Sequence, residues 1–288
     1  MFRLFFIFSA LLAAAPCSSA ELAPFKDALF AYPAILGQTD GGRRLVIDYN
    51  EMRDINGRDL EPERHVRKQY VTRLPNGAEQ DVTVKLSGQP LKFMQVGRPI
   101  GASIIVAYLH GKGGDRAQGQ NDSRFGGNFN RIRNMMLQSG GLYVTPDFSD
   151  FGEKGKEEVK AVLDFAIKAS PKAKVFVACG SMGGFICHRL AADAEFAPKL
   201  SGMLLLGSFP DPDFQKSAFF KRKTPLFIGH GGADKTSPID GMEAFYASLR
   251  KAAPAYPVWL HRFETGSHGT PIRMTDWRLA LNLMLAAQ

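Results

Sequence analysis

Solid apolar runs recur along the second two-thirds of the sequence, and segments with helical spacing lie between them. Strands without polar alternation are buried on both faces, which is typical of parallel sheets. The order of these runs and segments predicts an α/β fold with a doubly wound, mostly parallel sheet. The apolar runs are SIIVAYL (103–109), GLYVTPDF (141–148), KVFVACG (174–180), SGMLLLGS (201–208), TPLFIGH (224–230) and PVWLHRF (257–263), and the helical segments are about 128–138, 154–169, 183–195, 240–252 and 271–286.

The region from Arg44 to Leu91 has a different texture, with short runs in which apolar and charged residues alternate. The runs are RRLVIDYN, RKQYVTRL and QDVTVKL, and Asn76-Gly77 is a turn signal. We expect antiparallel leading strands at an edge of the sheet. No repeat, low-complexity tract or linker divides residues 21–288, so we predict a single domain.

Residues 1–20 resemble an export signal. Arg3 precedes the apolar run 4–15, and Pro16-Cys-Ser-Ser-Ala20 supplies the small residues that a signal peptidase reads. We expect cleavage after Ala20 and a secreted or periplasmic protein. The run is short for a bilayer span, which needs about 20 apolar residues, so an uncleaved anchor is the less favoured alternative and no stable membrane span is expected.

The distribution of charge narrows the range of partners. The formal net charge is +8, but the basic residues are scattered among acids without interleaved aromatic residues, so we expect no nucleic-acid partner.

Two cysteines, Cys179 and Cys187, remain outside the signal. One would end a strand and the other would lie in the second turn of the next helix. We expect their Cα atoms to lie beyond the roughly 7 Å limit for a disulfide.

A single serine, Ser181, lies among small residues where the strand 174–180 is expected to become a helix. A sharp strand–helix turn needs small neighbours, and Cys179, Gly183 and Gly184 meet that need. Ligand sites in such sheets form at the carboxyl ends of strands. The turn would hold the Ser181 hydroxyl above the sheet, at the N-terminus of the helix.

This strand–serine–helix unit resembles the nucleophile elbow of the α/β-hydrolase superfamily, in particular its small serine esterases and lipases. The common form is G-x-S-x-G, and Cys179 replaces the first glycine here. The resemblance implies a catalytic order of Ser, then an acid, then His. Asp234 follows the run 224–230 and His268 follows the run 257–263, in the order and at the strand ends that the superfamily uses.

The segment YLHGKGGD (108–115) resembles the glycine-rich loop that completes the oxyanion hole of this superfamily. The backbone N–H groups of Lys112 and Met182 are the candidates for the two donors. An ammonium at the mouth of the site, on Lys112, would favour anionic substrates.

Several other residues compete for these roles. Asp211 and Asp213 follow the run 201–208 and are rival acids, although the loop of Asp234 fits the commoner placement. We expect turn formation from Asp147 and Asp150 and structural roles for three histidines, His110, His188 and His230. The segment 210–223 is either a small cap over the site or a surface helix between strands.

The sequence thus predicts an exported serine hydrolase that cleaves a carboxylic ester through an acyl-enzyme on Ser181. A peptidase, amidase or thioesterase with the same three residues is the alternative, and a non-catalytic secreted binding protein is the less favoured one. The chemistry requires no metal and no organic cofactor. The expected partner is a small-molecule ester, with anionic and lipid-like molecules as candidates.

Overall fold

The computed structural model describes residues 21–60 and 65–288. The segment 1–20, which the sequence predicts to be an export signal, lies outside the described residues. In the part of the chain that is described, no helix combines the length and the apolar character that crossing a membrane requires.

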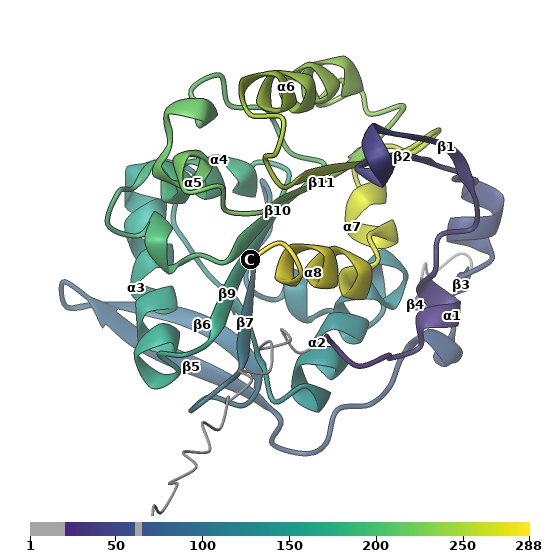
Figure 1. Cartoon of the computed structure of the whole chain (residues 1–288). Helices are drawn as coiled ribbons and strands as arrows, with labels where there is room; N and C mark the ends of the chain where they lie inside the picture. The colour runs from purple at the N-terminus through teal and green to yellow at the C-terminus, as the bar shows by residue number, and fades with distance from the viewer. Residues whose placement is uncertain (1–20, 61–64) are drawn as a thin grey trace, which may run out of the picture.

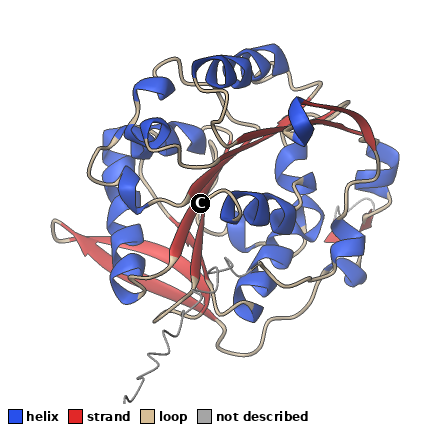
Figure 2. Cartoon of the chain, viewed as in Figure 1, coloured by secondary structure: helices blue, strands red, loops and turns tan. Residues whose placement is uncertain are grey.

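One large sheet crosses the molecule from lower left to upper right in Figure 2. Within the described residues it has ten strands, in the order β1-β2-β12-β11-β10-β9-β7-β8-β6-β5. Neighbours from β2 to β8 are parallel, and antiparallel pairs lie at both edges, which confirms the predicted fold class. The strands are β1 (Ile35–Thr39), β2 (Arg44–Ile47), β5 (Glu79–Leu86), β6 (Gln89–Gly97), β7 (Ile104–Leu109), β8 (Leu142–Pro146), β9 (Lys174–Gly180), β10 (Gly202–Leu206), β11 (Leu226–Gly231) and β12 (Val258–Phe263).

Helices cover both faces of this sheet (Figure 1). One face carries α3 (Glu153–Ala169), α4 (Gly183–Ala192), α5 (Ala218–Lys221) and α6 (Ile239–Ala252), and the other carries α2 (Asn128–Gln138), α7 (Thr270–Met274) and α8 (Trp277–Leu285). The short α1 (Asp27–Phe30) precedes β1, and β3 (Asp59–Leu60) pairs with β4 (His65–Val66) in a separate small sheet.

The solid apolar runs exist because the central strands serve two cores at once. In β7, Ile105 and Ala107 belong to the core under α3 to α6, while Ile104 and Val106 belong to the core under α2 and α8. Successive residues of a strand point to opposite faces, so a strand covered on both faces has no position left for a polar side chain.

The helices present apolar stripes to these cores. In α3 the buried apolar residues Val159, Val162, Leu163 and Ala166 recur every three or four positions, which places them on one side of the helix. The predicted segments 128–138, 154–169 and 240–252 agree with α2, α3 and α6 to within a residue at each end.

The two remaining helical segments differ from the prediction. The segment 271–286 is two helices, because Asp276 is the N-cap of α8 and its carboxylate accepts hydrogen bonds from the amides of Arg278 and Leu279. The segment 183–195 is helical only as far as Ala192, since Asp193 adopts an extended backbone.

The expectation of antiparallel strands from Arg44 to Leu91 is only partly correct. The run QDVTVKL lies in β5, which pairs with β6 in an antiparallel hairpin that turns at Ser87-Gly88. Asn76-Gly77 is also a turn, closed by a hydrogen bond from the Ala78 amide to Pro75 O at 3.1 Å. The run RKQYVTRL contains a short 3-10 turn, Lys68–Tyr70, and no strand. There the ring of Tyr70 packs edge-on against Phe30, with 5.6 Å between the ring centroids.

The strand β2 lies at the opposite end of the sheet from β5. It pairs in parallel with β12, and Ile47 packs against Phe263 and Met274. Burial of this side chain explains why β2 extends the sheet beyond β12 instead of pairing with the leading hairpin.

The segment 210–223 contains a 3-10 turn, Phe214–Lys216, followed by α5. Phe214 and Phe219 are fully buried in the core under α4 and α6. The segment is therefore anchored to the sheet face by two aromatic side chains.

Candidate active site

The chain turns sharply at Ser181, between the end of β9 and the start of α4. Ser181 has a φ of 50°, in the left-handed region that side chains other than glycine rarely adopt. Two contacts stabilise this conformation: the Ser181 amide donates to Leu206 O at 3.1 Å, and the Ser208 hydroxyl donates to Ser181 O at 2.9 Å. Strained backbone of this kind is found disproportionately at functional sites.

The glycines after the serine are required by close packing. A β-carbon on Gly183 would lie 2.6 Å from Leu109 O and 2.7 Å from His110 O, and one on Gly184 would collide with the Ser208 hydroxyl. Any larger residue would push α4 away from the ends of β7 and β10. The sequence interpretation of these glycines is confirmed by the packing.

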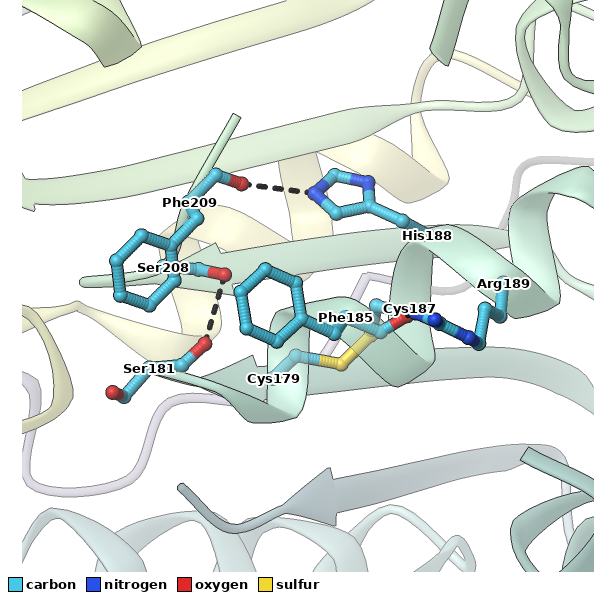
Figure 3. The surroundings of a disulfide bond; sticks show 8 residues. All are labelled: Cys179, Ser181, Phe185, Cys187, His188, Arg189, Ser208 and Phe209. Atoms are coloured by element: carbon cyan, nitrogen blue, oxygen red, sulfur yellow. Dashed lines mark hydrogen bonds between the residues drawn. A yellow bond between two sulfur atoms is a disulfide. The ribbon is translucent and has the colours of Figure 1, made fainter. Parts of the chain in front are cut away.

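Cys179 and Cys187 form a disulfide, so the prediction that they stay unpaired is wrong. Their Cα atoms are 6.4 Å apart, inside the roughly 7 Å limit. The tight turn at Ser181 folds α4 back across the end of β9, which brings the second turn of the helix over the strand. Figure 3 shows the bridge between strand and helix, with Ser181 beside it.

His268 lies between Ser181 and Asp234. Its Nε2 is 2.7 Å from Ser181 Oγ, and its Nδ1 is 2.7 Å from Asp234 Oδ2. A carboxylate only accepts hydrogen bonds, so Nδ1 carries the proton and Nε2 of the neutral ring accepts from the hydroxyl. This is the tautomer that can remove a proton from the serine.

Asp234 is held in a fixed orientation although its side chain is fully buried. Its Oδ1 accepts hydrogen bonds from the amides of Thr236 and Ser237, at 2.8 and 3.0 Å. Its Oδ2 is left for His268. A buried carboxylate is tolerated only when its oxygens are satisfied in this way.

The loops after β11 and β12 are joined through their backbones. The Ala233 amide donates to Gly266 O at 2.9 Å, and the Gly232 amide donates to Phe263 O at 2.6 Å. A β-carbon on Gly231 would collide with the carbonyls of Gly266 and Ser267. Glycine at this position lets the acid loop and the histidine loop lie against each other.

The glycine-rich loop after β7 passes directly over the serine. A β-carbon on Gly111 would lie 2.9 Å from Ser181 Cβ and 3.4 Å from its Oγ. Neither the Lys112 amide nor the Met182 amide donates to an acceptor within residues 21–60 and 65–288. Among the described residues no acceptor takes either N–H group, so both are free to bind a ligand.

The rival acids lie elsewhere. Asp211 is 4.0 Å from Nδ1 of His188, and Asp213 pairs with Lys216 on the surface. Asp147 accepts from Arg116, and Asp150 accepts from the Gly152 and Gly155 amides at the start of α3.

The three histidines with predicted structural roles, His110, His188 and His230, bond to main-chain carbonyls. His188 Nε2 lies 2.9 Å from Phe209 O and His230 Nε2 lies 2.7 Å from Ser237 O, while His110 stacks on Phe148 with 4.2 Å between centroids. Burial lowers the pKa of all three rings and favours their neutral forms.

Some residues around the serine were not predicted from the sequence. Ser208 and Phe209 follow β10, and Phe209 packs within 6.4 Å of the His268 ring, measured between centroids. Phe209 also stacks on Phe185 (Figure 3). A serine and a phenylalanine after a strand carry no signal of this role, because only the fold places that strand end next to β9.

A cleft with a volume of about 640 Å³ is lined by Ser267 and Gly269, the residues on either side of His268. Its other walls come from Tyr49, Ile55 and His65, from the segment 118–125 and from α7. Within the described residues, no group of three or more His, Cys, Asp or Glu side chains is arranged to hold a metal ion.

No protein-family model matches the sequence, and no curated protein is significantly similar to it. An esterase of Pyrococcus furiosus is 16% identical over 72% of this chain and 91% of its own, with a TM-score of 0.54. An α/β serine hydrolase homologue from Coxiella burnetii is 17% identical over 74% of this chain and 98% of its own, with a TM-score of 0.52. A lidless α/β serine hydrolase from Xanthomonas campestris is 17% identical over 75% and 97%, with a TM-score of 0.54. Likeness at this level of identity concerns the fold alone: this chain has the α/β-hydrolase fold.

Proposed function

We propose that this protein is a serine hydrolase that cleaves a carboxylic ester through an acyl-enzyme on Ser181. The observation that carries the proposal is the continuous hydrogen-bonded path from Ser181 through His268 to Asp234, with 2.7 Å at each step. A serine hydroxyl becomes a useful nucleophile only when a positioned base removes its proton, and the base needs an orienting acid.

In the proposed mechanism, His268 takes the proton as Ser181 Oγ attacks the ester carbonyl. Asp234 holds the imidazole and stabilises its cationic form. The N–H groups of Lys112 and Met182 bind the developing oxyanion, and loss of one such donor typically raises the barrier by about 3 kcal/mol. His268 then returns the proton to the leaving alcohol, and water cleaves the acyl-enzyme by the same steps.

Similar folds support a hydrolase at the general level. The structures from Pyrococcus furiosus and Xanthomonas campestris are described as an esterase and a serine hydrolase. The specific ester, and the preference for an ester over an amide or a thioester, are set by the walls of the cleft and not by the triad chemistry.

Export is part of the proposal. It is supported by the signal-like segment 1–20 and by the disulfide between Cys179 and Cys187, because structural disulfides persist mainly in oxidising compartments. We propose a secreted or periplasmic protein that begins at Glu21.

The proposal is tested by p-nitrophenyl butyrate turnover in the 21–288 chain and its Ser181→Ala variant. We expect the variant to lose at least about 10⁴-fold in kcat, because the nucleophile is absent. Butyryl p-nitroanilide, assayed in parallel, distinguishes an esterase from an amidase. Equal turnover by a folded Ser181→Ala variant would overturn the proposal, and so would an inactive wild type with an intact circular dichroism spectrum.

A further inference from the structure

The cleft beside His268 has a distinct chemical character. Its lining contains two arginines, Arg124 and Arg273, together with one histidine and two side-chain amides. Among the described residues that line it, none is an Asp or a Glu. The described part of the wall is therefore cationic and rich in hydrogen-bond donors.

The two arginines differ in how their charge is used. Arg273 is nearly buried and binds both oxygens of the fully buried Asp59, at 3.2 and 2.8 Å, so its charge is compensated. Arg124 is exposed, and its guanidinium meets no hydrogen-bond acceptor or carboxylate within residues 21–60 and 65–288. Within the part of the chain that the structure describes, Arg124 thus contributes a positive charge that has no ion-pair partner at the cleft.

The neighbouring amides add more donors than acceptors to the cleft. Asn121 Oδ1 already accepts from the amides of Ser123 and Arg124, at 2.9 and 2.7 Å. Gln118 Oε1 accepts from the Tyr108 hydroxyl at 2.9 Å. Both lone pairs of the Asn121 oxygen and one lone pair of the Gln118 oxygen are therefore used, while the NH₂ group of each residue donates to no acceptor among the described residues.

The backbone of this wall is held in an unusual conformation. Phe125, Gly126 and Gly127 are consecutive residues with positive φ values of 53°, 62° and 76°. A β-carbon on Gly126 would lie 2.9 Å from Arg273 Nη1, so this run packs against the second arginine. Of the three, only Phe125, which lines the cleft, is strained, because glycine adopts positive φ values freely.

We propose that this cleft binds an anionic group carried by the substrate, so that the preferred esters bear a carboxylate or a phosphate besides the ester bond. Guanidinium and amide N–H groups are the donors that recognise both anions. The inference rests on the proposed esterase function and extends it from a reaction to a substrate class.

The test compares esters that differ only in charge. Mono-p-nitrophenyl glutarate is paired with its methyl ester for an anion on the acyl side, and 4-acetoxybenzoate is paired with its methyl ester for an anion on the alcohol side. For each pair, the ratio of kcat/KM for the anionic ester to kcat/KM for the neutral ester is the charge preference. We expect wild type to prefer the anionic ester in at least one pair.

Arg124→Gln removes the charge, and Arg124→Lys keeps it. Because Arg124 is exposed, neither change leaves an unpaired group in the core. Arg222→Gln, at an exposed arginine after α5, is the matched control. We expect the charge preference to fall about fivefold in Arg124→Gln, as for a partly exposed ion pair, and to stay within twofold of wild type in the other two.

Inhibition of neutral-ester turnover by glutarate and by inorganic phosphate tells the two anions apart. The anion that the cleft takes will inhibit wild type more strongly than Arg124→Gln. An enzyme that turns over neutral esters but shows no charge preference in either pair, or an unchanged preference in Arg124→Gln, would overturn the inference and leave the proposed function standing. Wild type that turns over no ester would overturn both.

Discussion

At the scale of residues, the buried carboxylate of Asp234 has every contact that the catalytic proposal requires. Two backbone amides hold one oxygen, and His268 binds the other. Asp234 therefore has two roles at once. One oxygen forms the turn before the next helix, and the other orients the His268 ring.

The proposal predicts that Asp234→Asn lowers kcat for p-nitrophenyl butyrate by about 10⁴-fold, because an amide favours the wrong tautomer of the histidine. Asp213→Asn, in the exposed pair with Lys216, is the control and should stay within twofold of wild type. A larger loss in Asp213→Asn or Asp211→Asn than in Asp234→Asn would reassign the acid.

A second prediction concerns His261, a buried ring whose Nδ1 lies 2.8 Å from the Tyr32 hydroxyl. Burial lowers the pKa of His261 to about 3. Because this folded pKa is below the unfolded value of about 6.5, the stabilisation is complete above about pH 6.5 and is lost as the pH falls toward 3.

Between pH 6.5 and pH 5 this histidine alone should cost about 2 kcal/mol of unfolding free energy. Urea unfolding at the two pH values measures the loss, and His261→Gln should reduce it by about that amount. The exposed His65→Gln is the control. If His261→Gln retained the full wild-type loss, the acid sensitivity would have to come from other groups.

The three residues of the proposed triad could be identified from the sequence because each follows an apolar run at a strand end. The cleft residues could not, because Arg124 and Asn121 belong to an irregular segment whose neighbours are set by tertiary packing. Ser208 was missed for the same reason. Local patterns identify strand ends, whereas the contacts between different strand ends depend on the order of strands in the sheet.

At the scale of elements, the disulfide ties β9 to α4 across the turn that carries Ser181 (Figure 3). The sequence predicted the sharp turn but placed the two Cα atoms beyond bridging distance, whereas they are 6.4 Å apart. The positive φ at Ser181 reverses the chain within one residue, so the second helical turn lies above the strand end.

We predict that Cys187→Ala lowers the free energy of unfolding by about 2.5 kcal/mol, the chain-entropy value for a loop of this length. Urea unfolding of the 21–288 chain measures the change. Dithiothreitol should destabilise wild type by a similar amount and leave the variant unaffected. Two free thiols in unfolded, non-reduced wild type, with no effect of reductant on its stability, would contradict the bridge.

At the scale of the whole molecule, the N-terminal residues bind distant parts of the fold together. The Arg131 side chain is fully buried and pairs with Asp27 and Asp276, each at 2.9 Å. The strands β1 and β2 extend the sheet at the edge opposite β5. Alternation of apolar and charged residues identified β2 as a strand but not its partner. That partner is selected by burial of Ile47 on Phe263 and Met274, two residues far along the chain.

The doubly wound architecture was predictable because it depends only on the order of buried strands and helices. The same architecture supports the proposed function, because parallel strands bring the ends of β7, β9, β11 and β12 to one edge of the sheet. The loops that follow these strands then meet around Ser181.

The most direct measurement of the central claim is covalent labelling of the 21–288 chain by a fluorophosphonate probe, followed by mass mapping of the modified peptide. The account predicts one adduct on Ser181, no adduct in Ser181→Ala, and labelling at least about 10³-fold slower in His268→Ala. An adduct on another serine, or wild-type protein that remains unlabelled while folded, would contradict it.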